Sequence, residues 1–295
     1  MSLPIVFVHL GGPPPVYLRD AVKQARRWNP VAPIFCLSSV VEDYGHGETW
    51  VDISSIPVGP MHLRFQETTL LPGMEFDKGF WQLTTERLFV LEDWMRWTGT
   101  EEFFHLENDN MLYQEVSAIQ SFLKKISPGL STTFQGQGKD RSSLRVCFSI
   151  LYCSSLDALT NFLFYLASSP SGIDEMQRGG MYWQDTPEEC SFLATAPVGT
   201  VLESETYRAW IEDARFSSIF DSTTHGQYLG GVDPIHTGAT SSFINPDCDF
   251  RADQFMYTWG VDEEGRRYPV IADKDGRPWK IMNLHIHCKR LSDFA

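Results

Sequence analysis

Short apolar runs and an amphipathic helix alternate at the start of the chain. Residues 5–10 form an apolar run that a glycine- and proline-rich segment, 11–15, brings to an end. Apolar residues then recur at helical spacing from Leu18 to Trp28, and a second apolar run follows at 33–37. A buried strand, an amphipathic helix and another strand joined by short connections predict a parallel β-sheet unit.

A second helix and strand lead into an acidic motif. Apolar residues recur at helical spacing between Leu88 and Trp97, and Gly99 is placed to end this predicted helix. A compact apolar strand follows at 103–106 and runs directly into Glu107-Asn108-Asp109. The motif therefore lies at the carboxyl end of a predicted central strand, where open α/β sheets bind their ligands.

The second half of the chain continues this pattern and then becomes rich in loops. Residues 146–152 predict a buried strand, and residues 156–167 predict a helix. A further helix is predicted over 187–196, because threonine is a good cap and proline suits the first helical position. Two segments near the end, 268–271 and 279–287, predict a hairpin. The pattern as a whole predicts one α/β domain with a central, mostly parallel sheet flanked by helices.

Composition and charge narrow the class of protein. The chain has 295 residues and a formal net charge of −14, and its basic clusters are short and scattered, so no nucleic-acid partner is expected. The later apolar runs fall well short of the roughly 20 residues that a membrane span needs, and the apolar start is expected to be a first strand rather than a signal peptide. Six cysteines without a Cys-x-x-Cys pair favour a reducing, cytoplasmic location.

Two constellations carry candidate chemistry. Glu107 and Asp109 stand two residues apart, so both carboxylates can face one cation if the backbone stays extended. Near the C-terminus, strand alternation puts His285 and His287 on one face, and Lys289 follows. One imidazole would complete a metal site and the ammonium would contact phosphate. The alternatives are acidic turn formers and two hydrogen-bonded surface histidines.

These features together resemble the GT-A glycosyltransferases. The resemblance rests on the strand-helix-strand start, a helix that contains Arg87, a strand that ends in acid-x-acid, and a C-terminal His-x-His-x-Lys. The segments 103–110 and 226–234 are also similar to uncharacterised glycosyltransferase-like proteins of bacteria and large DNA viruses. The first acid of the motif is glutamate where the family usually has aspartate, a variant that the family tolerates. The resemblance implies a GT-A fold and a nucleotide-diphosphate sugar as donor.

The resemblance also implies roles for individual residues. The metal, Mn²⁺ or Mg²⁺, would be bound by Asp109 and by His287 or His285, with Glu107 near the metal or the ribose. Lys289 would contact phosphate, and Arg87 would approach the diphosphate unless it forms a surface ion pair on its helix. The loop after the first strand would face the nucleotide base, through His9, Leu10 and Gly11. Residues 1–115 would then bind the nucleotide sugar, and residues 116–295 would bind a glycan or other hydroxyl acceptor.

A catalytic base is required only if the reaction inverts the anomeric centre. The sequence candidates are Asp185, Glu188, Glu189 and Asp233, although the two glutamates also suit the start of a helix. Glycosyl transfer is the leading hypothesis. A metal-dependent nucleotidyltransferase or phosphohydrolase is the first alternative, because metal-held carboxylates also serve phosphoryl transfer, and a non-catalytic nucleotide-sugar binder is the second.

Overall fold

A computed structural model of the chain describes residues 2–67, 79–126, 129–135, 144–168, 173–197, 211–212, 217–232 and 255–295. In this part of the chain a seven-stranded sheet forms the centre, in the order β3-β2-β1-β4-β7-β6-β8. Its strands are β1 (Ile5–His9), β2 (Ile34–Ser38), β3 (Thr49–Asp52), β4 (Phe103–Leu106), β6 (Leu130–Phe134), β7 (Val146–Cys153) and β8 (Cys190–Leu193). Only β7 runs against its neighbours β4 and β6, so the predicted, mostly parallel sheet is confirmed.

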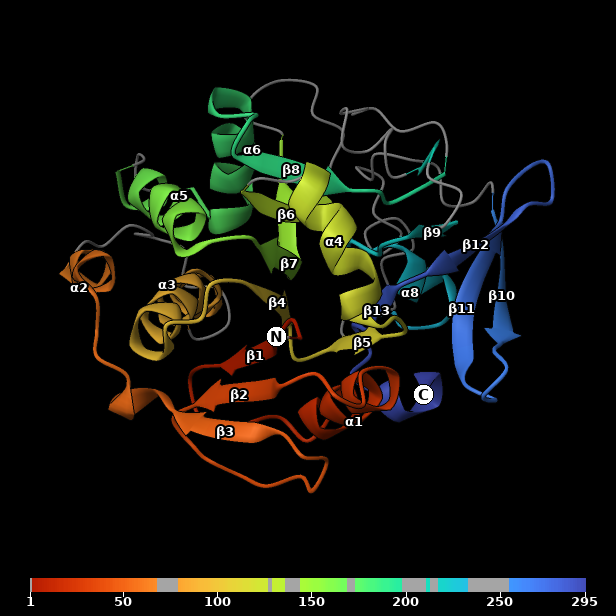
Figure 1. Cartoon of the computed structure of the whole chain (residues 1–295), viewed down its shortest axis with the longest axis horizontal. Coiled ribbons are helices and arrows are strands. Elements are labelled where there is room, and N and C mark those ends of the chain that lie inside the picture. The colour runs from red at the N-terminus through yellow and green to blue at the C-terminus, as the bar shows by residue number, and fades with distance from the viewer. Residues whose placement is uncertain are drawn as a thin grey trace.

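Helices cover both faces of this sheet because its strands are apolar on both faces (Figure 1). In β1, Ile5 and Phe7 pack into the hydrophobic cluster that contains α1 (Leu18–Trp28) and α4 (Val116–Ile126). Val6 and Val8 point the other way, into the cluster that contains the second set of helices. That set consists of α2 (Pro60–Glu67), α3 (Phe80–Thr98), α5 (Leu156–Ser168) and α6 (Glu175–Asp185).

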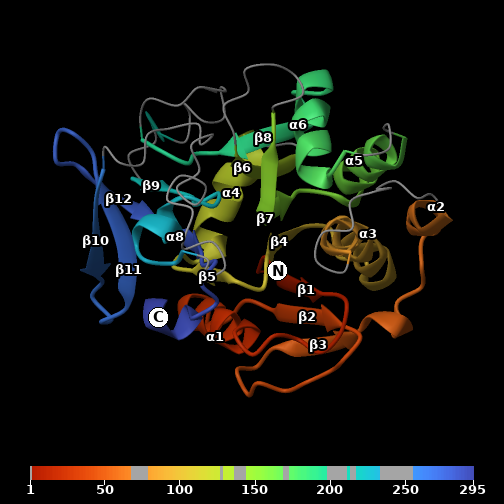
Figure 2. The ribbon, with the colours of Figure 1, turned by 180° about the vertical axis from the view of Figure 1, so that it is seen from behind.

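Two smaller sheets attach the C-terminal segment to this core (Figures 1 and 2). The short strand β5 (Asn110–Leu112) pairs with β13 (Asn283–His285) in antiparallel register. The other sheet has the order β10-β11-β12-β9, with β9 (Ser218–Ile219), β10 (Met256–Val261), β11 (Arg267–Ala272) and β12 (Pro278–Ile281). The remaining described elements are α8 (His225–Tyr228) and the 3₁₀ helices η1 (Ile53–Ser55) and η6 (Leu291–Phe294).

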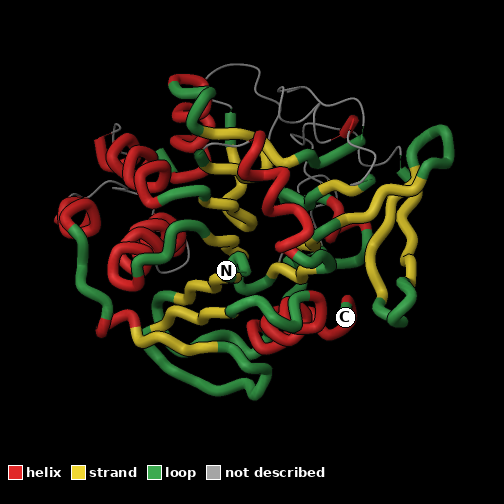
Figure 3. The backbone as a smooth tube through the Cα atoms, viewed as in Figure 1, coloured by secondary structure: helices red, strands yellow, loops and turns green. Residues whose placement is uncertain are grey.

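Two sequence predictions about local structure need correction. The helix predicted over 187–196 is wrong: Thr186 is the C-cap of α6, and the buried strand β8 occupies 190–193, where pairing with β6 outweighs the local helix signals (Figure 3). The C-terminal hairpin pairs β11 with β12 as predicted, but the second strand ends at Ile281 and β13 joins a different sheet. No helix among the described residues is both long and apolar enough to cross a membrane.

Candidate metal and donor site

The acidic motif lies where β4 leaves the sheet. The backbone N–H of Glu107 donates to the Ser149 carbonyl at 2.8 Å, and that of Asn110 donates to the Glu107 carbonyl at 3.0 Å. This tight turn directs both acidic side chains of the motif to the carboxyl edge of the sheet and then starts β5. Pairing of β5 with β13 places His285 opposite Asn110, and the N–H of Ile286 donates to the Asp109 carbonyl at 2.9 Å. Residues far apart in the sequence thereby meet at one edge.

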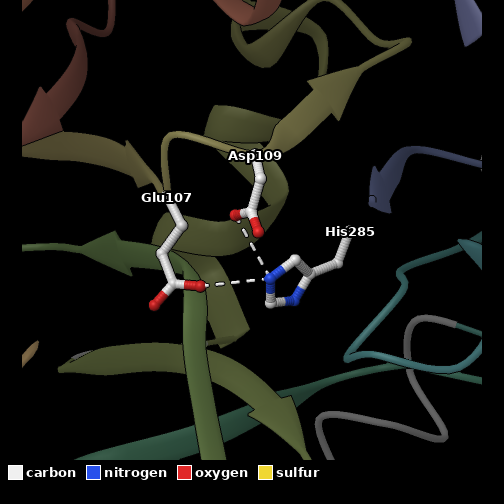
Figure 4. Close-up of side chains that lie close together, drawn as sticks. All are labelled: Glu107, Asp109 and His285. Atoms are coloured by element: carbon white, nitrogen blue, oxygen red, sulfur yellow. Dashed lines mark ion pairs between the residues drawn. The ribbon is translucent and has the colours of Figure 1, made fainter. Parts of the chain in front are cut away.

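Three side chains converge at this point (Figure 4). Nε2 of His285 lies 3.3 Å from Oε2 of Glu107 and 3.2 Å from Oδ1 of Asp109. One potential ligand atom from each residue lies within 4.8 Å of the other two. Two carboxylate oxygens and one imidazole nitrogen are a donor set suited to Mn²⁺ or Mg²⁺, so the residues present fit a divalent cation.

Of the two candidate histidines, the structure brings His285 to the carboxylates. His287 stacks edge-on against it, with ring centroids 4.4 Å apart, and is not a member of the converging group. Burial, followed by the positive charge of His285, lowers the pKa of His287 to about 4. Of the two histidines that the sequence offered as ligands, His285 ends β13 and reaches both carboxylates, and His287 lies beside it.

Two cations face the two carboxylates. Arg87, from α3, forms an ion pair with Glu107, and Lys289 forms one with Asp109. Burial opposes ionisation of both acids, but Arg87 and His285 lower the pKa of Glu107, and His285 and Lys289 hold the pKa of Asp109 well below its usual range. Lys289 also has a left-handed backbone, with φ of 59°, a conformation uncommon outside glycine. The acidic motif is thus ionised and poised to bind positive charge.

The loop expected to face a nucleotide base borders the same edge. Nδ1 of His9, the last residue of β1, lies 3.0 Å from the side-chain amide of Asn108 within the acidic motif. Leu10 follows half-buried, and Gly11 has a φ of 89° with Leu83 beside it, so that a Cβ atom there would lie 2.7 Å from the leucine Cδ1. A side chain at position 11 would therefore be strained as well as crowded.

Two further residues of this edge were missed at the sequence level. Tyr17 lies beside it, with the Lys289 ammonium 5.5 Å from its ring centroid. Glu175, the first residue of α6, is buried and accepts a hydrogen bond from the Thr85 hydroxyl at 3.2 Å. Burial raises the pKa of Glu175 to about 7, and the positive charge of Arg87 limits the rise.

The Gly179-Gly180 pair explains how α6 reaches this position. A Cβ atom on Gly179 would lie 2.3 Å from Cγ2 of Val146, and one on Gly180 would lie 2.4 Å from the Leu144 carbonyl. The helix therefore packs closer to β7 than larger residues would allow. A glycine pair inside a helical pattern is the signal that could have revealed this close packing.

Two of the proposed base candidates, Asp185 and Glu189, do not share this site. Asp185 ends α6 and accepts a hydrogen bond from the Tyr165 hydroxyl at 2.7 Å. Glu189 directly precedes β8, and its carbonyl receives the N–H of Leu130, the first residue of β6. Both acids thus lie at the amino edge of these strands, opposite the edge that carries Glu107, and we do not retain them as catalytic candidates. Asp233 lies outside the described residues.

Comparisons with known proteins give structural likenesses only. No family model and no curated protein matches the chain. Mouse xyloside xylosyltransferase 1 aligns with a TM-score of 0.47 and 9% identity, covering 66% of this chain and 86% of that protein. The galactosyltransferase LgtC, in complex with donor and acceptor sugar analogues, aligns with a TM-score of 0.43 and 11% identity, covering 70% of this chain and 82% of that protein. A glycosyltransferase involved in glycosylation of the PBCV-1 major capsid aligns with a TM-score of 0.36 and 11% identity, covering 65% of this chain and 81% of that protein.

Proposed function

We propose that this protein is a metal-dependent glycosyltransferase that moves a sugar from a nucleotide-diphosphate sugar to an acceptor hydroxyl. The observation that carries the proposal is the convergence of Glu107, Asp109 and His285 on one point at the carboxyl edge of a mostly parallel sheet. The acid-x-acid and His-x-His-x-Lys motifs, on which the resemblance to GT-A enzymes rests, supply these same residues.

The three converging residues would hold the cation, either Mn²⁺ or Mg²⁺. When bound, such a cation supplies a Lewis acid that stabilises negative charge on the departing diphosphate. The two anionic ligands balance the charge of the divalent cation, and Arg87 and Lys289 add net positive charge beside it, so the site can still attract a phosphate group. In an acidic protein this is a compact way to reverse the local field.

Arg87 and Lys289 provide positive charge from the protein itself. Arg87, on α3, contacts Glu107, and Lys289, on the C-terminal segment, contacts Asp109. Because charge on the diphosphate grows as the bond to the sugar breaks, fixed cations beside it stabilise the transition state more than the bound donor. We propose that Lys289 contacts phosphate, and that Arg87 faces the diphosphate while it remains paired with the acidic motif.

Glu175 has a supporting role in this proposal. Its side chain is only 2% exposed, so it does not contact the acceptor in this arrangement. Glu175 and Arg87 interact electrostatically, since the positive charge of Arg87 lowers the pKa of Glu175 against the larger, opposite effect of burial. We propose that Glu175 positions Arg87 and assign no catalytic base, since a retaining enzyme needs none.

Different parts of the chain are proposed to bind the donor and the acceptor. We propose that residues 1–115 bind the nucleotide sugar, with His9, Leu10 and Gly11 beside the base, and that residues 116–295 form the acceptor side. The pairing of β4 with β7 in the central sheet, and of β5 with β13, supports one domain made of both parts. His285 and Lys289 of the second part contact the acidic motif of the first part.

Thermal unfolding with a panel of UDP-, GDP- and TDP-sugars, with and without Mn²⁺, tests the proposal. A donor at about 100 times its dissociation constant adds about 2.7 kcal/mol to the stability of the folded state, a rise in Tm on the order of 5 °C or more. We expect this rise for one nucleotide family and only with Mn²⁺. Slow release of nucleoside diphosphate and free sugar should accompany it.

Three outcomes would contradict the proposal. Release of inorganic phosphate or of a nucleoside monophosphate would identify a phosphohydrolase or nucleotidyltransferase. Binding without any turnover, even with a range of hydroxyl acceptors, would identify a nucleotide-sugar binder. An equal rise in Tm with a chelator in place of Mn²⁺ would remove the metal from the proposed function.

A further inference from the structure

The buried carboxylate of Asp221 holds the strand that carries His285. Asp221 is fully buried, and its Oδ1 accepts the backbone N–H groups of Thr224 at 2.7 Å and His225 at 2.8 Å. Its Oδ2 accepts the N–H of Gly226 at 2.8 Å and that of His285 at 3.0 Å. One side chain therefore ties the start of α8 to the backbone of the histidine in β13.

The packing around this carboxylate is close. A Cβ atom on Gly226 would lie 2.4 Å from the His285 carbonyl and 3.2 Å from Oδ2 of Asp221. Asn283 adds a second connection, because its side-chain oxygen accepts the N–H of Asp221 at 3.0 Å and its amide donates to Oδ1 of Asn110 at 2.9 Å. The backbone of β13 is thus fixed both to the segment after β9 and to the end of the acidic motif.

Ser222, the residue after Asp221, orients the imidazole ring of His285. Nδ1 of His285 lies 3.3 Å from the Ser222 carbonyl, which can only accept, so Nδ1 carries the proton of that contact. The opposite ring nitrogen, Nε2, is the one that faces Glu107 and Asp109. A histidine whose second nitrogen donates to a backbone carbonyl is the usual arrangement at protein metal sites, since it fixes the ring orientation.

We propose that Asp221 is a positioning residue for the metal site: its carboxylate fixes the backbone of His285, while the adjoining Ser222 carbonyl fixes the ring. The inference rests on the proposed function for the presence of a metal, and it names a residue outside the converging group. Asparagine at position 221 would keep the size but replace one accepting oxygen with an NH₂ group, which would face N–H donors. The start of α8 and β13 would then move apart, and the side chain of His285 would be displaced from Glu107 and Asp109.

The test is Mn²⁺ binding by the whole chain, measured by titration and by electron spin-echo spectroscopy for the nitrogen coupling of a bound imidazole. We expect wild-type protein to bind Mn²⁺ with imidazole coupling. For Asp221→Asn we expect affinity to fall by about 10- to 100-fold, the usual effect of losing an outer-shell partner, with weakened imidazole coupling. Asp273→Asn is the matched control, because Asp273 also accepts backbone N–H groups, from Asp275 and Arg277, but in the β11–β12 turn.

The outcomes separate the two proposals. Folded Asp221→Asn protein with wild-type affinity and unchanged imidazole coupling would overturn the role of Asp221 alone. Wild-type protein that binds no Mn²⁺ would overturn both the metal site and this inference. If Asp221→Asn does not fold, Asp221→Glu replaces it, since it keeps the charge but displaces the carboxylate by one methylene. The same weakening of imidazole coupling is then expected, and unchanged coupling would again overturn the role.

Discussion

Two histidines among the described residues each contact two carboxylates, yet only one of these clusters brings three potential metal ligands to one point. His285 contacts Glu107 and Asp109 at the carboxyl edge of the sheet. His62, on α2, contacts Asp93 and Glu86 on α3. A composition-based search would rank the two clusters equally, because both contain one histidine, one aspartate and one glutamate.

The difference lies in which ring nitrogens the acids approach. At His285, both carboxylates approach Nε2, so three ligand atoms surround one point. At His62, Asp93 approaches Nδ1 at 2.6 Å while Glu86 approaches Nε2 at 3.2 Å, so the ring stands between the acids. Among the residues that the structure describes, only the His285 group brings three such atoms together. The arrangement of the same residue types therefore separates a candidate ligand set from an ion-pair bridge.

The His62 cluster joins two helices. Asp93 also accepts the N–H of Gly59, just before α2, at 2.8 Å, and Gln66 donates to Glu86 at 3.2 Å. Burial lowers the pKa of His62, but Asp93 and Glu86 outweigh it and raise the pKa to about 9. The histidine is therefore charged at neutral pH, and the cluster holds α2 against α3.

The largest effect that distinguishes the clusters should come from removing one aspartate charge from each. Asp109→Asn is expected to weaken Mn²⁺ binding by about 100-fold or more, because an anionic ligand becomes neutral while the side chain keeps its shape. Asp93→Asn, the matched control, should leave Mn²⁺ affinity unchanged and lower the Tm instead. Calorimetric titration and thermal unfolding of both variants measure the two effects. Equal loss of Mn²⁺ affinity in both variants would end the distinction.

A smaller effect should appear in the pH dependence of stability. The pKa of His62 is raised from 6.5 to about 9 in the folded protein, so its ion pairs contribute fully below pH 6.5 and are lost as pH rises through about 9. We expect His62→Gln to be less stable than wild type at pH 6.5 and to close part of this gap by pH 9. Urea unfolding at both pH values, with and without Mn²⁺, measures the difference. A constant gap across this range would show that the charge of His62 contributes nothing.

The smallest effect on stability and on Mn²⁺ binding is expected for Glu189, an acid that lies in neither histidine cluster. Glu189 accepts hydrogen bonds from the Tyr182 hydroxyl and, at 3.2 Å, from the Asn161 amide, and glutamine can accept the same bonds. Glu189→Gln should therefore change the free energy of unfolding by no more than about 1 kcal/mol and leave Mn²⁺ affinity and any turnover unaltered. A large loss of turnover in a stably folded variant would return Glu189 to the catalytic candidates.

The first strands and helices of the chain and the place of the acidic motif follow from local sequence. Apolar runs bounded by glycine, proline or acidic residues marked β1, β2 and β4, and the end of β4 put Glu107 and Asp109 at the carboxyl edge of the sheet. These features depend on a few adjacent residues, whose burial pattern and turn chemistry can be read directly.

Tertiary structure decided which distant groups meet. The register of β13 against β5 selected His285 over His287, because a shift along the strand would present a different side chain to the same edge. Pairing with β6 made a strand of residues 190–193 and placed Glu189 at the far edge, whereas close packing at Gly179 and Gly180 brought Glu175 to the near one. Asp221 reaches His285 only because the chain folds back across 64 positions. Such contacts depend on long-range packing, which local patterns of polarity do not encode.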